Sequence, residues 1–195
     1  MPAPQSSERL VFFTDAVVAI AITLLVLPLV DAVPEAADTG TGPLDLVAEQ
    51  STQIYSFLLS FVVIARLWLV HHRLFADVTA VTGSLLWWNM AWLLTIVVLP
   101  FPTELVGSYD GRAVPLIYIG TVLASAVCQS ALALIIRRHR LDGSASGRPV
   151  GGSVRSTAAI AAAFVLTLLV PAVGFWSLLL LVAEPWVTRL ARRRA

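Results

Sequence analysis

Several apolar stretches in this chain are long enough to cross a lipid bilayer, and their length constrains the fold more than any other feature. A hydrocarbon core of about 30 Å requires about 20 consecutive apolar residues in a helix. The 195-residue chain is 58% hydrophobic and 13% charged, whereas a soluble domain carries about 25% charged residues. We therefore expect an all-α integral membrane protein.

Six apolar segments define the expected transmembrane helices. Each must satisfy its backbone hydrogen bonds internally, so a helix is the default for every span. The segments are 10–30, 54–70, 85–102, 114–136, 157–173 and 175–187. The last two are short, and a single re-entrant element is the alternative for that part of the chain. We expect residues 1–195 to form one six-helix membrane domain.

The distribution of arginine predicts how the chain is oriented. The link after residue 136 carries five arginines and the C-terminal tail carries four. The link after residue 30 contains Asp31, Glu35, Asp38 and Asp45 but no arginine. Because cytoplasmic loops collect Lys and Arg, both termini are expected in the cytoplasm and the acidic link outside. The chain is then a multi-pass protein of the plasma membrane.

A few ionisable residues lie within the apolar segments, where an Asp or Arg costs about 2.5–3.5 kcal/mol on insertion scales. Asp15 and Arg66 are expected at a similar depth near the cytoplasmic face. We predict that Asp15 is ionised and paired with Arg66 or Arg9. Arg66 could instead extend its charged group to the lipid headgroups.

The neighbouring histidines 71 and 72 point about 100° apart on a helix, so they cannot both ligate one metal ion from a regular helix. A hydrogen-bonded anchor at the base of the helical bundle is the favoured interpretation, and no metal site is expected. Asn89 is a polar residue in the middle of an apolar segment and should bond to another helix.

Other functional classes find no support in the sequence. Cys128 is the only cysteine, which excludes a disulfide framework. No glycine-rich phosphate loop is present, and no nucleophile–base pair or metal triad is expected at one depth. We therefore expect no enzyme, no cofactor and no nucleic-acid partner.

One face of the first helix carries Ile20, Thr23, Leu24 and Leu27 at i, i+3, i+4 and i+7. That face is apolar apart from one hydroxyl group. From composition alone, an ordinary helix packed by aliphatic side chains is the simpler interpretation.

The stretch "RLVFFTD" at residues 9–15 resembles the Arg-x-x-x-Phe-Ser-Asp signature of the transmembrane protein 175 family, potassium channels of endolysosomes and bacteria. The stretches "HHRLF" and "LLWWNMAWLLTIVVLPFPTEL" extend the similarity to about residues 9–106. Thr14 stands where the family has Ser, which keeps the hydroxyl group. Arg66 is not a feature that we associate with the family.

The resemblance implies six helices per repeat and a pore that lacks a TVGYG carbonyl filter. The first helix would line this pore at the axis of an oligomer. Animal members carry two repeats, so one repeat implies a homotetramer within the lipid bilayer. The constriction and selectivity filter would be Ile20, then Thr23, then Leu27 toward the outside. Passive, moderately selective conduction of K⁺ would follow, with monovalent cations as the only small-molecule substrates.

The resemblance also suggests a role for the polar signature residues. Arg9, Phe13, Thr14 and Asp15 would form a structural network with groups from other helices, His72 and Asn89 among them, and this network would fix the rotation of the pore helix.

Two alternatives remain open at this point. Asp15 could be a cation-attracting charge at the inner vestibule of a pore. The protein could also be a proton-coupled or other secondary transporter that uses Asp15 and Arg66.

Overall fold

The computed structural model describes residues 7–139 and 141. Every secondary-structure element within them is a helix, in the order α1 (Ser7–Leu24), α2 (Leu27–Thr39), α3 (Pro43–Glu49), α4 (Ser51–Phe75), α5 (Gly83–Val98), α6 (Pro100–Ser108) and α7 (Ala113–Arg138). The two segments expected at 157–173 and 175–187 lie outside the described residues.

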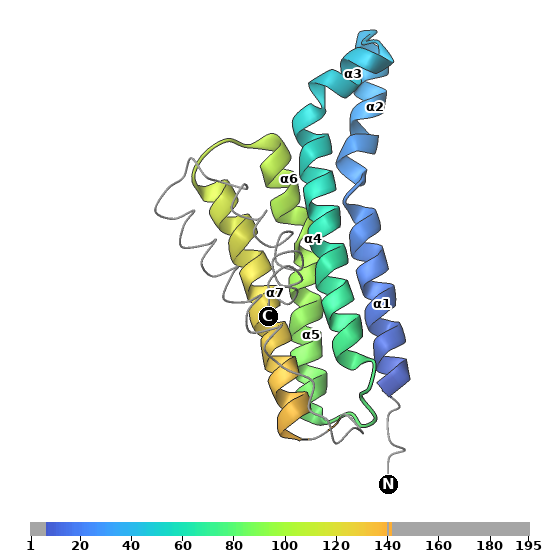
Figure 1. Ribbon diagram of the computed structural model, residues 1–195. Coiled ribbons are helices and arrows are strands. Elements are labelled where there is room, and N and C mark those ends of the chain that lie inside the picture. The colour runs from blue at the N-terminus through green and yellow to red at the C-terminus, as the bar shows by residue number, and fades with distance from the viewer. Residues whose placement is uncertain (1–6, 140, 142–195) are drawn as a thin grey trace, which may run out of the picture.

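These helices form four stretches that are long and apolar enough to cross a membrane. The stretches are Ser7–Thr39, Ser51–Phe75, Gly83–Ser108 and Ala113–Arg138. They alternate in direction along the chain (Figure 1). The expectation of an all-helical, multi-pass membrane protein is confirmed, whereas six helices per subunit, the location of the termini and the lining of a pore stay predictions.

Two helical stretches run further than the apolar pattern suggested. The first continues through α2 to Thr39, and the acidic segment that we expected as a plain link contains a further short helix, α3. The third continues through α6 to Ser108 rather than ending near residue 102. Hydropathy marks where the hydrocarbon core ends, but a helix can continue into water when its charged side chains are exposed. Gly40 closes α2 with a left-handed φ of 75°, a conformation that glycine adopts readily.

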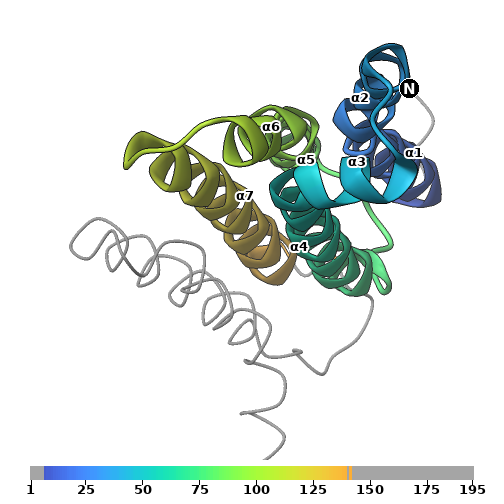
Figure 2. The same ribbon diagram turned by 90° about the horizontal axis from the view of Figure 1, so that it is seen from above.

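The helix α1 lies at one edge of the described bundle. It packs against α4 and α5, whereas α7 packs against α5 and α6. Figure 2 shows α1 with α2 on one side of α4 and α5, and α7 on the other side. The helix that is expected to line a pore is therefore peripheral within the described bundle.

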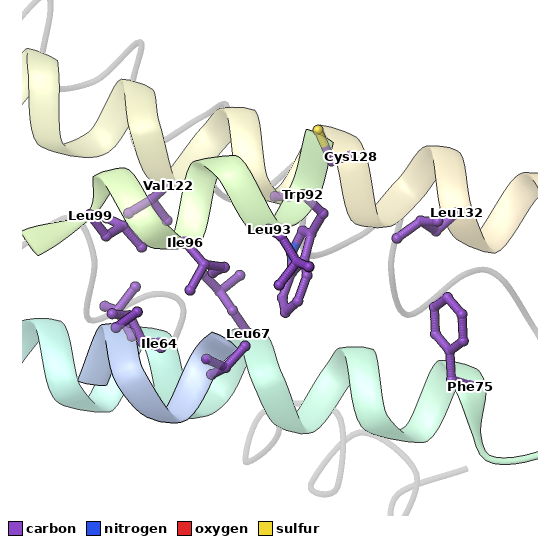
Figure 3. Packing of buried hydrophobic residues seen from close by; sticks show 14 of the residues in the cluster. Ile64, Leu67, Phe75, Trp92, Leu93, Ile96, Leu99, Val122, Cys128 and Leu132 are labelled. Carbon is purple, nitrogen blue, oxygen red and sulfur yellow. The ribbon is translucent and has the colours of Figure 1, made fainter. Parts of the chain in front are cut away.

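The core is filled by apolar side chains from α4, α5 and α7, and several of them have no exposed surface at all. Figure 3 shows the central packing, with Ile64, Leu67 and Phe75 from α4, Trp92, Leu93 and Ile96 from α5, and Val122, Cys128 and Leu132 from α7. The thiol of Cys128 is thus a small core group.

Buried hydroxyl groups tie three helices together in this core. The Thr103 hydroxyl donates to Ser60 Oγ at 2.7 Å, and Ser60 Oγ lies 3.0 Å from Tyr118 Oη. These residues belong to α6, α4 and α7, and all three are buried. Hydrogen bonds between helices supply specificity within a membrane, where apolar contacts alone distinguish poorly between protein and lipid.

At the opposite end of the bundle from the N-terminus of α1, α4 and α6 are joined by a second polar contact. Gln53 Nε2 donates to Glu104 Oε2 at 2.5 Å, and the Ser108 hydroxyl donates to Glu104 Oε1 at 2.7 Å. A Cβ atom on Gly107 would overlap Gln53 Oε1. Gly107 therefore provides the space in which the Gln53 side chain is held.

The substitution Gly107→Ala should lower the thermal unfolding midpoint of the protein in detergent. The new methyl group displaces Gln53 from Glu104, and a bond to a carboxylate is worth about 1.5–3 kcal/mol. Replacing glycine in a helix returns about 1 kcal/mol, so the expected net loss is about 1 kcal/mol. Gly83→Ala is the matched control, because no atom lies within 4 Å of its new Cβ. Equal midpoints for the two variants would contradict the assigned role of Gly107.

Candidate functional site

A buried chain of three polar side chains joins α1, α4 and α5. Asn89 Nδ2 donates to Thr14 Oγ1 at 2.9 Å, and Asn89 Oδ1 lies 2.8 Å from His71 Nε2. Because the amide oxygen can only accept, His71 Nε2 carries the hydrogen and donates it. All three side chains are fully buried. Asn89 is thus the central link, and both ends of its amide are used.

The His71 ring is held in a fixed orientation by two aromatic neighbours. Its centroid lies 4.2 Å from that of Trp92 and 4.4 Å from that of Phe75, with interplanar angles of 16° in both pairs. The ring therefore cannot swing away from Asn89 without unstacking from both neighbours. The polar chain is as rigid as the aromatic packing around it.

Asp15 makes a second set of contacts beside this buried chain. Trp68 Nε1 donates to Asp15 Oδ1 at 2.8 Å, and His72 Nδ1 lies 3.9 Å from Asp15 Oδ2. The Asp15 side chain is about one-third exposed and that of His72 about half exposed. A carboxylate that accepts an indole N–H bond and faces a histidine is better stabilised near hydrocarbon than an isolated one.

Of the six expected signature residues, four make these contacts and two do not. Thr14 meets Asn89, and Asp15 meets His72. Arg9 and Phe13 lie on the exposed side of α1. The ion pair expected between Asp15 and Arg66 or Arg9 is not among the contacts of Asp15, whose partners are Trp68 and His72. Arg66 is partly buried on α4.

Of the participants, His71 was expected only as a hydrogen-bonded anchor beside His72, and Trp68 was not expected at all. The spacing of α4 could have indicated the first, because Ile64, Leu67, His71 and Phe75 form one buried stripe. His72 lies about 100° away from that stripe. Trp68 precedes His72 by four residues and therefore shares its face, which is where Asp15 lies.

The opposite face of the first helix is exposed in the part of the chain that the structure describes. The buried residues of α1 are Leu10, Thr14, Val18 and Ala21. In contrast, Ile20 is 61% exposed and Leu27 is 47% exposed. Thr23 is also exposed, and its hydroxyl donates to the Ile20 carbonyl at 2.8 Å. The three residues expected to form a constriction are thus all exposed in the described structure.

Within the part of the chain that the structure describes, no three His, Cys, Asp or Glu side chains gather into a possible metal site. The polar groups are instead used in pairs that connect helices. One side of α1 thus carries the anchored polar residues, and the other side carries apolar residues that are exposed in the described structure.

Comparison with known proteins places this arrangement in a family. Residues 9–100 match the family model described as "Endosomal/lysosomal potassium channel TMEM175". A potassium channel of Chamaesiphon minutus is 36% identical over 132 residues, which cover 64% of each chain. A potassium channel of Streptomyces collinus is 35% identical over 103 residues, which cover 53% of this chain and 48% of that one. The chain thus spans between about half and two-thirds of the length of these curated relatives.

A solved structure extends the similarity to nearly the whole chain. It is the crystal structure of a lysosomal potassium-selective channel TMEM175 homolog from Chamaesiphon minutus, with a TM-score of 0.71 and 26% identity. The match covers 94% of this chain and 97% of that one. The fold is that of a multi-pass membrane protein, and the relatives that it matches are named as ion channels and not as enzymes. Over residues 9–100 the chain matches the TMEM175 family, and along almost its full length it is similar to this bacterial homolog.

The substitution Thr14→Val should destabilise the protein more than Thr14→Ser. Valine keeps the shape of threonine but leaves the buried Asn89 amide without its acceptor, at a cost of about 1–3 kcal/mol. Serine keeps the hydroxyl and removes one methyl group, worth about 0.8 kcal/mol. Thermal unfolding midpoints in detergent measure the difference. If Thr14→Val were the more stable of the two, the Asn89–Thr14 bond would not be a significant anchor.

Proposed function

We propose that this chain forms a passive, moderately potassium-selective cation channel. The channel is a homotetramer in the plasma membrane, with α1 lining a central pore at the symmetry axis. Ile20, Thr23 and Leu27 form the constriction, in that order toward the outside. Both termini face the cytoplasm, as the arginine-rich links suggest. The channel needs no cofactor, and the permeant K⁺ is its only ligand.

The main observation behind this proposal is that the two sides of α1 differ: one is hydrogen-bonded to other helices and the other is exposed. One side is fixed to α4 and α5 by Asn89, Trp68 and His72. The other side presents Ile20, and Leu27 follows at the start of α2; both are more than 40% exposed. An apolar helix face at the edge of a subunit can meet lipid or other subunits. The match to a channel family favours contact with other subunits over contact with lipid, because the pore of a channel must be lined by protein.

The chemistry of the constriction is compatible with moderate selectivity for potassium. Four Ile20 side chains would make a narrow apolar ring that can gate by dewetting. A cation that crosses such a ring sheds part of its hydration shell, and K⁺ holds water more weakly than Na⁺. The Thr23 hydroxyls, one turn outward, would replace some of the lost water. Selectivity of this kind should be weaker than that of a cage of carbonyl groups.

Protons are a second permeant ion to consider. A chicken relative, 35% identical over 115 residues that cover 56% of this chain and 23% of that one, is named an endosomal/lysosomal proton channel. A measurement of proton flux beside potassium flux decides whether this chain conducts both.

The substitution Ile20→Asn should remove most of the discrimination between potassium and sodium. A polar ring wets the constriction and lets hydrated ions pass, so the reversal potential under biionic conditions should move toward zero. Liposomes or planar bilayers that contain the purified protein provide the measurement. Ile20→Val keeps an apolar ring and serves as the control, with selectivity close to that of the wild type. Unchanged reversal potentials in the asparagine variant would contradict the assignment of Ile20.

When the purified protein is cross-linked in detergent, a denaturing gel should show a series of bands that ends at the mass of four subunits of 21.0 kDa each. A tetramer surrounds one pore with four copies of α1. Light scattering on the detergent complex gives an independent mass. A ladder that ends at two subunits would contradict the proposed pore geometry.

A further inference from the structure

Three exposed arginines lie at the end of the bundle where α4 and α7 finish. Arg73 is in the last turn of α4, and Arg137 and Arg138 are the last two residues of α7. All three side chains are exposed in the part of the chain that the structure describes. We call these three residues the basic patch.

The loop after α4 joins the two helix ends. The Thr79 backbone N–H and the Thr79 hydroxyl both donate to the Leu141 carbonyl, at 2.9 and 3.0 Å. Val78 and Leu141 are both buried, and Figure 1 shows the loop beside the last turn of α7. The ends of α4 and α7, and with them the arginines, therefore lie at the same level of the bundle.

The carboxylates at this end of the bundle do not neutralise the basic patch. They belong to Glu8, Asp15 and Asp77. Asp15 is already bonded to Trp68 and lies beside His72. Within residues 7–139 and 141, no ion pair joins any of the three carboxylates to the patch. Because arginine keeps its charge at any physiological pH, the patch presents three positive charges to its surroundings.

The basic patch lies where a boundary between membrane and water is expected. It ends two of the stretches that are long and apolar enough to cross a membrane, Ser51–Phe75 and Ala113–Arg138. Trp87 and Trp88, near the start of α5 at the same end of the bundle, are exposed. Exposed tryptophans are enriched at the level of the lipid headgroups. The arginines are therefore close to the level of the phosphate groups of a bilayer.

Two exposed leucines lie one helical turn further into the membrane than two of the arginines. Leu69 precedes Arg73 by four residues and Leu134 precedes Arg138 by four, so each leucine shares a helix face with its arginine. Leu69 is 43% exposed and Leu134 is 41% exposed. A charged group at the boundary with an apolar group below it matches the headgroup and the acyl chain of a lipid. A soluble phosphate would contact only the first.

We propose that the basic patch binds the headgroup phosphate of an anionic phospholipid, whose acyl chain lies against Leu69 or Leu134. Guanidinium groups donate paired hydrogen bonds to phosphate oxygens, and basic residues beside a membrane helix attract anionic lipids. This inference goes beyond the proposed function, because the site does not involve α1 and does not require the chain to conduct ions.

The substitutions Arg73→Gln and Arg138→Gln test the site, with phosphatidylglycerol as the probe. Native mass spectrometry of the purified protein in detergent counts the bound lipid molecules as this lipid is added. Each variant should bind it about fivefold more weakly than the wild type, the equivalent of about 1 kcal/mol per basic residue. Arg112→Gln is the matched control. It removes an exposed arginine at the opposite end of α7 and should leave the affinity unchanged.

Three results would contradict the proposal. An equal loss of affinity in Arg112→Gln would mean that only the net charge of the protein matters. Equal binding of phosphatidylglycerol and phosphatidylcholine, with the same acyl chains, by the wild type would mean that the headgroup is not recognised. Full displacement of phosphatidylglycerol by an equal concentration of soluble glycerol phosphate would mean that the patch binds free phosphate rather than lipid.

A second measurement uses the wild type alone, so that it holds even if a variant does not fold. Fluorescently labelled phosphatidylglycerol and phosphatidylcholine are titrated into the protein in detergent at low and high salt. Because salt screens exposed charges, the preference for phosphatidylglycerol should fall steeply as salt rises, whereas the binding of phosphatidylcholine should stay constant. A preference that does not change with salt would overturn the role of the arginines.

Discussion

The structure depends on the hydrogen bonds that Asn89 makes to Thr14 and His71. Within a bilayer, an aliphatic helix face gains little by choosing protein over lipid, because both are equally apolar. The aliphatic residues of α1 therefore cannot fix its rotation or depth by themselves. A buried amide with both ends bonded can do so, because any shift of α1 would leave Asn89 and Thr14 unsatisfied where no water is available.

Two adjacent residues of α1, Thr14 and Asp15, together fix the rotation of the helix about its axis. Thr14 bonds into the core and Asp15, about 100° further round the helix, bonds to Trp68 and His72 on a different face. Two attachment points at different angles define a rotation, which one point alone would not. Six residues beyond Thr14, the rotation of Ile20 is therefore set by groups that never contact it. This explains how an ionisable residue in an apolar helix can serve a structural purpose.

The sequence predicted the helical class, the first four spans and most of the anchor, but not its full geometry. Apolar length identifies spans because backbone hydrogen bonding leaves no other option in lipid. Whether His71 or His72 meets Asn89 depends on how α4 is rotated relative to α5. The amino-acid composition does not determine this rotation. The extension of α2 was missed because hydropathy falls at Asp31 while the helix continues. The break after Leu24 required backbone geometry, although Pro28 signals it in retrospect.

The break between Leu24 and Leu27 divides the first membrane helix into two parts, α1 and α2, which are held to the other helices by different contacts. Ile20 and Thr23 belong to α1, which is bonded to α4 and α5 through Thr14 and Asp15. Leu27 belongs to α2, which packs mainly on α4. Because three-residue bonds connect the two parts, a change of angle at the break would move Leu27 without straining the bonds of Asn89. The inner part of the proposed constriction is thus fixed by polar anchoring, whereas among the described residues no side-chain hydrogen bond joins α2 to another membrane helix.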